Sequence, residues 1–119
     1  MVDEIRPSEL EPLLETDEEP VIVDIRNQMS FRQHHIPGSQ NIPFQQLPQE
    51  VEAVRGEDHV VTVCPHGKAS IKAARLIASF EGFDGDVESL ETGITGWDGP
   101  LASDSGQTDE PDESSAAPF

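Results

Sequence analysis

The sequence predicts an α/β fold in which a small, mostly parallel sheet is flanked by helices. Two short runs of mainly β-branched residues, 21–25 and 60–63, are almost continuously apolar, which is typical of strands buried on both faces of a parallel sheet. Between and after these runs lie stretches whose apolar residues recur at helical spacing. This alternation of strand and helix patterns is typical of an α/β layer with right-handed crossovers. A chain of 119 residues has the size of one domain, which excludes separate cofactor and substrate domains.

The elements before the second strand are short. Ser8 and Glu11 form a capping box that predicts a first helix through Glu15, although Pro12 limits its length. After the strand at 21–25, short helices are expected over residues 28–34 and 47–54. Proline and glycine residues between them mark turns.

The clearest helix follows the strand at 60–63. Its apolar stripe has helical spacing and consists of Ile71, Ala74, Leu76, Ile77 and Phe80. Ser70 suits the N-terminus of this helix, and Gly82 lies where a left-handed C-cap is expected. A last strand over 87–90 leads into residues 93–97, where Trp97 is expected to pack against the end of the fold.

Charge excludes several classes of partner. The chain holds 24 acidic and 7 basic residues, a formal net charge of −17, which argues against binding to nucleic acids or anionic membranes. No apolar run has the length of a transmembrane helix, and the N-terminus lacks the regions of a signal peptide. We therefore expect a cytoplasmic protein.

The acidic residues are spread over the whole chain. Residues 1–101 carry a net charge of −12 and form the predicted domain, whereas residues 102–119 carry −5 and contain no base. The composition of this segment predicts a disordered acidic tail, for which solvation is favoured over partner recognition. Low lysine content and widespread carboxylates suggest a halophilic protein, because concentrated salt screens charge over about 3 Å at 1 M. An acidic docking surface in ordinary salt is the alternative.

Cys64 is the only cysteine, so an intramolecular disulfide and a multi-cysteine zinc cage are excluded. A lone cysteine serves either packing or chemistry. This one ends a strand, where ligands bind in open α/β sheets. The loop at 65–70 then leads into a helix, and its backbone N–H groups and the helix dipole favour both an anion and a nucleophilic thiolate.

Loop residues 65–70 are the candidate substrate-binding residues: Pro65, His66, Gly67, Lys68, Ala69 and Ser70. Gly67 permits the backbone angles of a tight loop. Lys68, one of two lysines, is expected to favour the Cys64 thiolate and attract an anionic substrate, although exposed side chains at Lys68 and Lys72 are the alternative. His66 is either a solvent-facing residue or a proton donor at the rim.

Three residues are candidates for supporting this loop. Asp24 and Arg26 end the neighbouring strand, where a structural ion pair is favoured over catalysis. His34 and His35 are adjacent and point in different directions, with no carboxylate cluster at ligand spacing, so no metal site is expected. His35 is expected to be buried and hydrogen-bonded.

Four segments together resemble single-domain rhodaneses in order and spacing: residues 23–26 (VDIR), 35–43 (HIPGSQNIP), 64–70 (CPHGKAS) and 93–97 (GITGW). The resemblance covers about residues 3–101. It implies the rhodanese fold and a sulfurtransferase that needs no cofactor or metal. Cys64 would accept a sulfane sulfur from thiosulfate or a persulfide and pass it to cyanide, a thiol or a sulfur-acceptor protein.

Two other functions compete with sulfur transfer. Phosphatases of this fold need a longer loop and an arginine six positions after the cysteine, where this chain has Ser70. Many rhodaneses have Arg, Ser or Thr in place of Ala69, and thiosulfate-preferring members often have a strong cation in place of His66, which weakens the case for thiosulfate. A non-catalytic rhodanese-fold binding module is the alternative function, and the intact Cys64 and Gly67 favour the enzyme.

Overall fold

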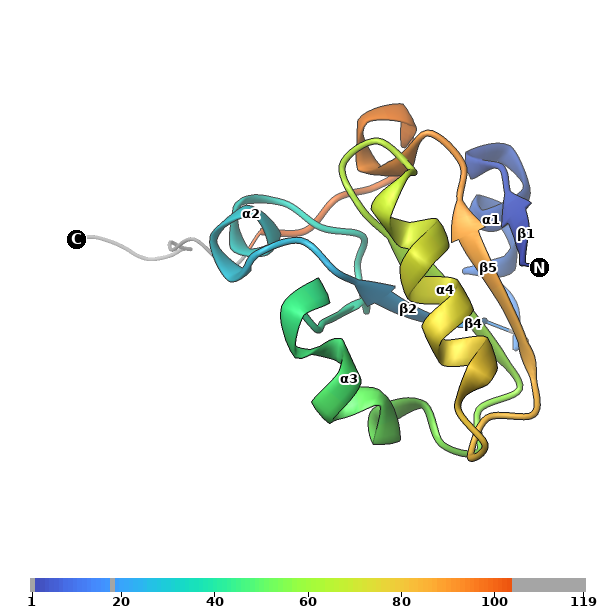
Figure 1. The fold of residues 1–119 in the computed structure, drawn as a ribbon. Helices are drawn as coiled ribbons and strands as arrows, with labels where there is room; N and C mark the ends of the chain where they lie inside the picture. Colours follow the sequence, from blue (N-terminus) through green and yellow to red (C-terminus); the bar gives the residue numbers. More distant parts are fainter. Residues whose placement is uncertain (1, 18, 104–119) are drawn as a thin grey trace.

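The computed structural model describes residues 2–17 and 19–103 and confirms an α/β fold. Its five strands form one parallel sheet in the order β1-β5-β4-β2-β3 (Figure 1). The strands are β1 (Asp3–Ile5), β2 (Val21–Asp24), β3 (Gln40–Asn41), β4 (His59–Val63) and β5 (Asp86–Leu90). The central strand, β4, directly precedes Cys64.

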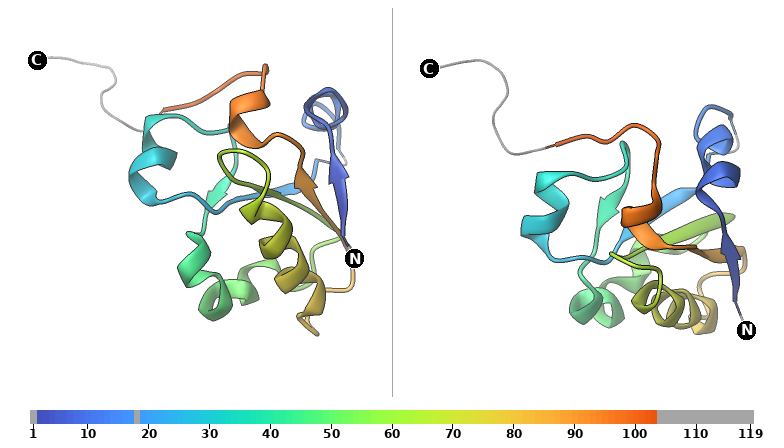
Figure 2. Two further views of the ribbon diagram at one scale, coloured as in Figure 1. Left: turned by 45° about the horizontal axis from the view of Figure 1, so that its top comes forward. Right: turned by 90° about the horizontal axis from the view of Figure 1, so that it is seen from above.

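Helices cover both faces of the sheet and make a three-layer structure. They are α1 (Pro7–Leu13), α2 (Gln28–Gln33), α3 (Leu47–Glu50) and α4 (Ala69–Ser79), with 3₁₀ turns η1 (Phe44–Gln46), η2 (Val51–Val54) and η3 (Gly93–Gly96). Figure 2 shows α3 and α4 on one face, with α1 and η3 on the other. The helix expected over 47–54 is therefore an α-helical turn that continues as a 3₁₀ turn.

Each face of the sheet has its own apolar core, because side chains alternate along the strands. Val23 and Val60 lie in the core beneath α3 and α4. Ile22 and Val61 lie in the opposite core, which also holds Trp97. This two-sided burial explains the almost continuous apolar runs in the sequence.

Strand register brings the carboxyl ends of three strands together. Asp24 of β2 pairs with Val63 of β4, and Thr62 of β4 pairs with Ser89 of β5. The residues that follow β2 and β5 therefore flank Cys64.

The start of α1 differs from the prediction. The helix begins at Pro7, and the N–H of Arg6 donates to Glu9 Oε1 at 3.0 Å. The expected capping box of Ser8 and Glu11 is wrong, because proline at the first helical position sets the N-cap at Arg6, two residues earlier.

Gly82 is not the left-handed C-cap of α4. Positive φ angles occur at four described glycines, and Gly82 is not among them. A Cβ at this position would lie 2.6 Å from the Phe80 ring and 2.8 Å from the Arg55 guanidinium. Gly82 therefore makes room for the packing of Arg55 over Phe80.

The edge strands β1 and β3 were not predicted, and they span only three and two residues. Of the predicted tail, the structure describes Ala102 and Ser103, and Ala102 exchanges backbone hydrogen bonds with His35. The rest of the predicted tail lies outside the described residues. No helix in the described part of the chain is long and apolar enough to cross a membrane.

Candidate active site

Cys64 lies at the centre of the loop between β4 and α4. Its side chain is buried, with the residue only 2 % exposed. The N–H of Gly67 donates to Sγ at 2.9 Å, and Ser70 Oγ lies 3.3 Å from Sγ. The sulfur is therefore held by a backbone amide from the loop and a hydroxyl from the first turn of α4.

These contacts favour the thiolate. Burial raises the pKa of the Cys64 thiol, but hydrogen bonds to the sulfur outweigh this effect and bring the pKa below its ordinary value. The hydroxyl of Ser70 contributes most to the lowering, followed by the N–H groups of Ser70, Gly67 and His66. The Cys64 thiol therefore ionises more readily than a free thiol, as a nucleophilic cysteine requires.

Buried hydroxyl groups from β4 and β5 contact Ser70, the residue whose hydroxyl lies against the sulfur. Ser70 Oγ is 2.6 Å from Ser89 Oγ, and the Thr62 hydroxyl donates to the carbonyl of Ser70 at 2.7 Å. All three residues are fully buried. Ser89 can donate to Ser70 while Ser70 donates to the thiolate, which aims the Ser70 hydroxyl at the sulfur. The Ser70 side chain therefore supports Cys64 from below and does not face solvent.

The other predicted loop residues differ in exposure. Pro65, His66 and Lys68 are exposed, Ala69 is half-buried, and Gly67 is buried. Lys68 is not among the groups that lower the pKa of Cys64. The expected effect of Lys68 on the thiolate stays a prediction, since the lowering of the Cys64 pKa described above comes from neutral donors in contact with the sulfur.

Replacing Ser70 by Ala is expected to raise the pKa of the Cys64 thiol, because the thiolate loses its hydroxyl donor. The acidic limb of a profile of thiol alkylation rate against pH should then move to higher pH. Ser79→Ala, which removes an exposed hydroxyl from the same helix, should leave the profile in place. A Ser70→Ala profile that matches the unmodified protein would contradict the assigned role.

The segment after β5, which includes η3, is hydrogen-bonded to the Cys64 loop. Ile94 donates its N–H to the carbonyl of Cys64 at 2.9 Å, and Thr95 donates to Pro65 at 3.2 Å. Thr92 and Gly93 have positive φ angles of 64° and 63°, and a Cβ on Gly93 would clash with the backbone of Cys64 and Pro65. The sequence prediction assigned this turn no role in holding the loop.

Asp24 and Arg26 form a buried ion pair beside the loop. Arg26 Nη2 lies 2.8 Å from Asp24 Oδ2, with side chains 5 % and 1 % exposed. Arg26 Nε also donates to both carboxylate oxygens, and Nη2 donates to the carbonyl of His34 at 2.6 Å. The pair therefore ties the end of β2 to the end of α2, as a structural support would.

Asp24→Ala is expected to destabilise the fold by about 3–5 kcal/mol, because it leaves a buried guanidinium without its carboxylate. Chemical denaturation of both proteins measures the difference. Glu52→Ala breaks the exposed pair with Arg55 and should leave the denaturation midpoint nearly unchanged. An Asp24→Ala midpoint equal to that of Glu52→Ala would show that the buried pair contributes little.

His35 has the buried, hydrogen-bonded environment that was expected. Its Nδ1 lies 2.6 Å from the carbonyl of Phe31, and the two rings stack with centroids 3.9 Å apart. Trp97 is buried as expected, and its indole N–H donates to the carbonyl of Pro100.

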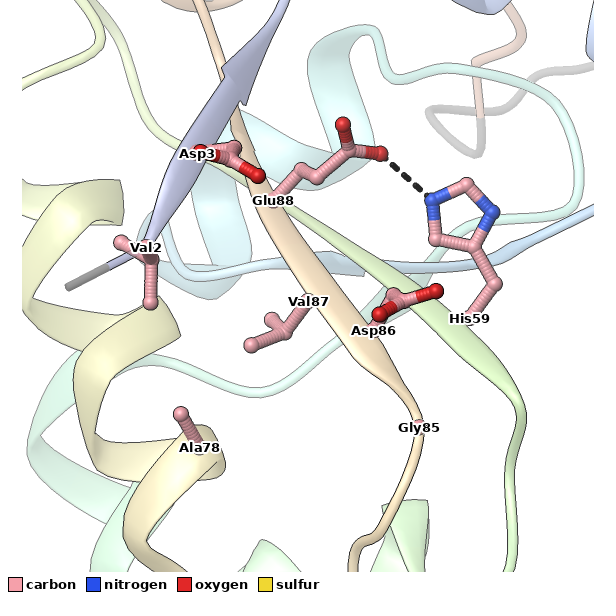
Figure 3. A pocket seen from close by; sticks show the side chains of 8 residues that line it. All are labelled: Val2, Asp3, His59, Ala78, Gly85, Asp86, Val87 and Glu88. Carbon is pink, nitrogen blue, oxygen red and sulfur yellow. Dashed lines mark hydrogen bonds and ion pairs between the residues drawn. The ribbon is translucent and has the colours of Figure 1, made fainter.

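A hollow lies where β4 and β5 begin, at the end of the sheet opposite to Cys64. It has a volume of about 430 Å³, and His59 Nε2 lies 2.6 Å from Glu88 Oε1 within it (Figure 3). No group of three residues suited to a metal ion occurs within residues 2–17 and 19–103. The hollow is separate from Cys64, which follows the other end of β4.

The fold and the loop define a class of protein: small parallel α/β domains that hold one free cysteine in the loop between a strand and a helix. The profile of the family described as Rhodanese-like domain matches residues 6–99. The chain therefore belongs to the rhodanese-like domain family.

Sequence relatives include two bacterial proteins named Thiosulfate sulfurtransferase GlpE. The one from Pseudoalteromonas translucida is 33 % identical over 81 residues, which cover 68 % of this chain and 75 % of that protein. The one from Shewanella oneidensis is 38 % identical over 76 residues, or 64 % and 73 % of the two chains. A rhodanese-like domain protein from Staphylococcus aureus has a similar structure, with a TM-score of 0.75 and 25 % identity over 86 % of this chain and 98 % of that one.

Proposed function

We propose that this protein is a sulfurtransferase that carries a sulfane sulfur on Cys64. The observation that carries the proposal is the set of hydrogen bonds on the Cys64 sulfur, which favours the thiolate. Its relatives named for thiosulfate sulfurtransferase activity support the same reaction class.

The reaction has two displacements. The Cys64 thiolate attacks the outer sulfur of thiosulfate, an S–S bond forms to Cys64, and sulfite leaves with the electron pair of the broken S–S bond. The anionic persulfide is stabilised by the backbone N–H groups of the loop. Cyanide or a thiolate then attacks the terminal sulfur, and the electron pair of the breaking S–S bond returns to Cys64 as thiolate. Neither step requires a metal or cofactor.

The alternative function is a binding module without sulfur chemistry. Such a module has no need of a backbone amide and a hydroxyl that both contact one buried sulfur. These contacts favour catalysis, and the sulfur chemistry is assigned to residues 1–101, apart from the acidic segment 102–119.

Steady-state kinetics test the proposed reaction. With thiosulfate and cyanide as substrates, thiocyanate formation should give parallel double-reciprocal lines, because sulfite leaves before cyanide reacts. Intersecting lines would contradict a persulfide intermediate. Absence of turnover with thiosulfate and with an organic persulfide would support the binding module.

The acidic composition is assigned to adaptation to a salt-rich cytoplasm. At −17, self-repulsion opposes the folded state at low ionic strength and is screened at high ionic strength. The melting temperature should therefore fall as KCl is removed. A melting temperature that is unchanged in dilute buffer would favour an acidic docking surface in ordinary salt.

A further inference from the structure

The region around Cys64 has the opposite charge to the rest of the chain. No Asp or Glu occurs between Asp58 and Glu81, although the chain as a whole has a net charge of −17. Three of the seven lysine and arginine residues fall in this interval: Lys68, Lys72 and Arg75. The interval includes the Cys64 loop and α4.

These three cations form one line on the surface, here called the basic stripe. Lys68 precedes α4, and Lys72 and Arg75 follow at intervals of four and three residues, which places them on one side of a helix. All three are exposed, whereas Ala73, Ala74 and Ile77 on the other side are buried. At 1.5 Å per residue the stripe extends for about 10 Å from the Cys64 loop, along the helix labelled α4 in Figure 1.

The cations of the basic stripe have no acidic partner in the part of the chain that the structure describes. The ion pairs there involve other cations, namely Arg6, Arg26, Arg55 and His59. The stripe thus presents unneutralised positive charge beside the nucleophile of a strongly acidic protein.

We propose that the basic stripe docks a sulfur-acceptor protein whose thiol is surrounded by carboxylates. This inference rests on the proposed sulfurtransferase function, because it names the partner of the second displacement. Carboxylates that touch the stripe are attracted to it, and those that touch the acidic surface elsewhere are repelled, so the docked partner is oriented with its thiol toward Cys64.

The shape and charge of the basic stripe favour a protein partner over a small anionic ligand or a nucleic acid. The stripe lies on the exposed, convex side of a helix, whereas small ligands are held in concave sites. A nucleic acid carries charge along its whole length and is repelled by the chain's net charge of −17. A folded partner can place a few carboxylates on the stripe and keep the rest of its surface away.

Docking also assists the chemistry. Carboxylates near a thiol disfavour its thiolate, and pairing them with the stripe removes this effect. The acceptor thiol gives its proton to solvent, and its thiolate attacks the terminal sulfur of the Cys64 persulfide. A new S–S bond forms on the acceptor, and the electron pair of the old S–S bond returns to Cys64.

Two synthetic peptides test the proposal. Each contains one Cys, flanked in one peptide by four Glu and in the other by four Gln. The rate of sulfur transfer from the persulfide form is measured at the lowest KCl concentration that preserves the folded circular dichroism spectrum. We expect the Glu peptide to react about tenfold faster, an advantage that shrinks as KCl is raised.

Lys72→Gln/Arg75→Gln should remove the advantage of the Glu peptide and leave the rate with cyanide unchanged. The matched control, Arg6→Gln/Arg55→Gln, changes the net charge equally at residues outside the stripe and should keep the advantage. Equal rates for both peptides with the unmodified protein would overturn the proposal. So would binding of a thymidine oligonucleotide that the stripe variant alone loses, since that would assign the stripe to nucleic acid.

Failure of the proposed function is distinguishable from failure of this inference. If cyanide turnover is normal but the peptides react equally, only the docking surface is contradicted. If no turnover occurs, fluorescence anisotropy with a labelled Glu peptide carrying Ser in place of Cys measures docking alone. Binding that the stripe variant loses and the control variant keeps would support the surface, and equal binding by both variants would overturn it.

Discussion

Cys64→Ser is expected to lower the rate of thiocyanate formation by at least about a thousandfold, because the reaction loses its nucleophile. A serine hydroxyl stays protonated at neutral pH and cannot form a persulfide. The measurement is thiocyanate release from thiosulfate and cyanide at saturating donor.

The fold should survive this substitution. Serine can accept the N–H of Gly67 and pair with Ser70 in the space that the sulfur occupied. Thermal melting and circular dichroism should therefore resemble those of the unmodified protein. A folded Cys64→Ser protein that still produces thiocyanate would place the chemistry elsewhere in the molecule.

Gly67→Ala is expected to disrupt the loop and to lower both stability and sulfur transfer. Gly67 has a φ of +87°, and a Cβ there would lie 2.8 Å from Thr92 N, 3.2 Å from Gly93 N and 3.2 Å from Leu90 O. These atoms belong to the backbone, so they cannot move aside cheaply. We expect a loss of about 2–4 kcal/mol in the free energy of unfolding.

The same substitution should raise the pKa of the Cys64 thiol, because the N–H of Gly67 is displaced from the sulfur. Gly56→Ala is the matched control. Gly56 has a similar φ of +81°, and a Cβ there meets nothing within 4 Å. Gly56→Ala should lower the free energy of unfolding by about 1–2 kcal/mol, because alanine disfavours a positive φ. It should leave thiol reactivity unchanged. Equal effects of the two substitutions on reactivity would contradict the role of Gly67.

The central elements of the fold could be predicted because their burial requires apolar residues at regular positions within each element. β2 and β4 are covered on both faces, so their residues are almost all apolar. The apolar stripe of α4 repeats at helical spacing. β1 and β3 lack such a signal, because two or three residues at a sheet edge are held by backbone hydrogen bonds to a neighbouring strand.

The site could be predicted only in part. Cys64 and Gly67 follow from their position between a strand and a helix, and the four-segment resemblance indicated the family. Ser89 could not be linked to the sulfur, because its contact with Ser70 depends on the register of β4 and β5. The charge of Lys68 is visible in the sequence, whereas the N–H of Gly67 that donates to the sulfur becomes visible only with the loop conformation.

Intact-mass measurement of the protein after incubation with thiosulfate decides whether Cys64 carries the sulfur. We expect a gain of one sulfur atom on the unmodified protein, its complete removal by cyanide, and no gain on Cys64→Ser. Absence of any sulfur adduct after thiosulfate or an organic persulfide, on protein whose Cys64 is shown to be a free thiol, would rule out a Cys64 persulfide.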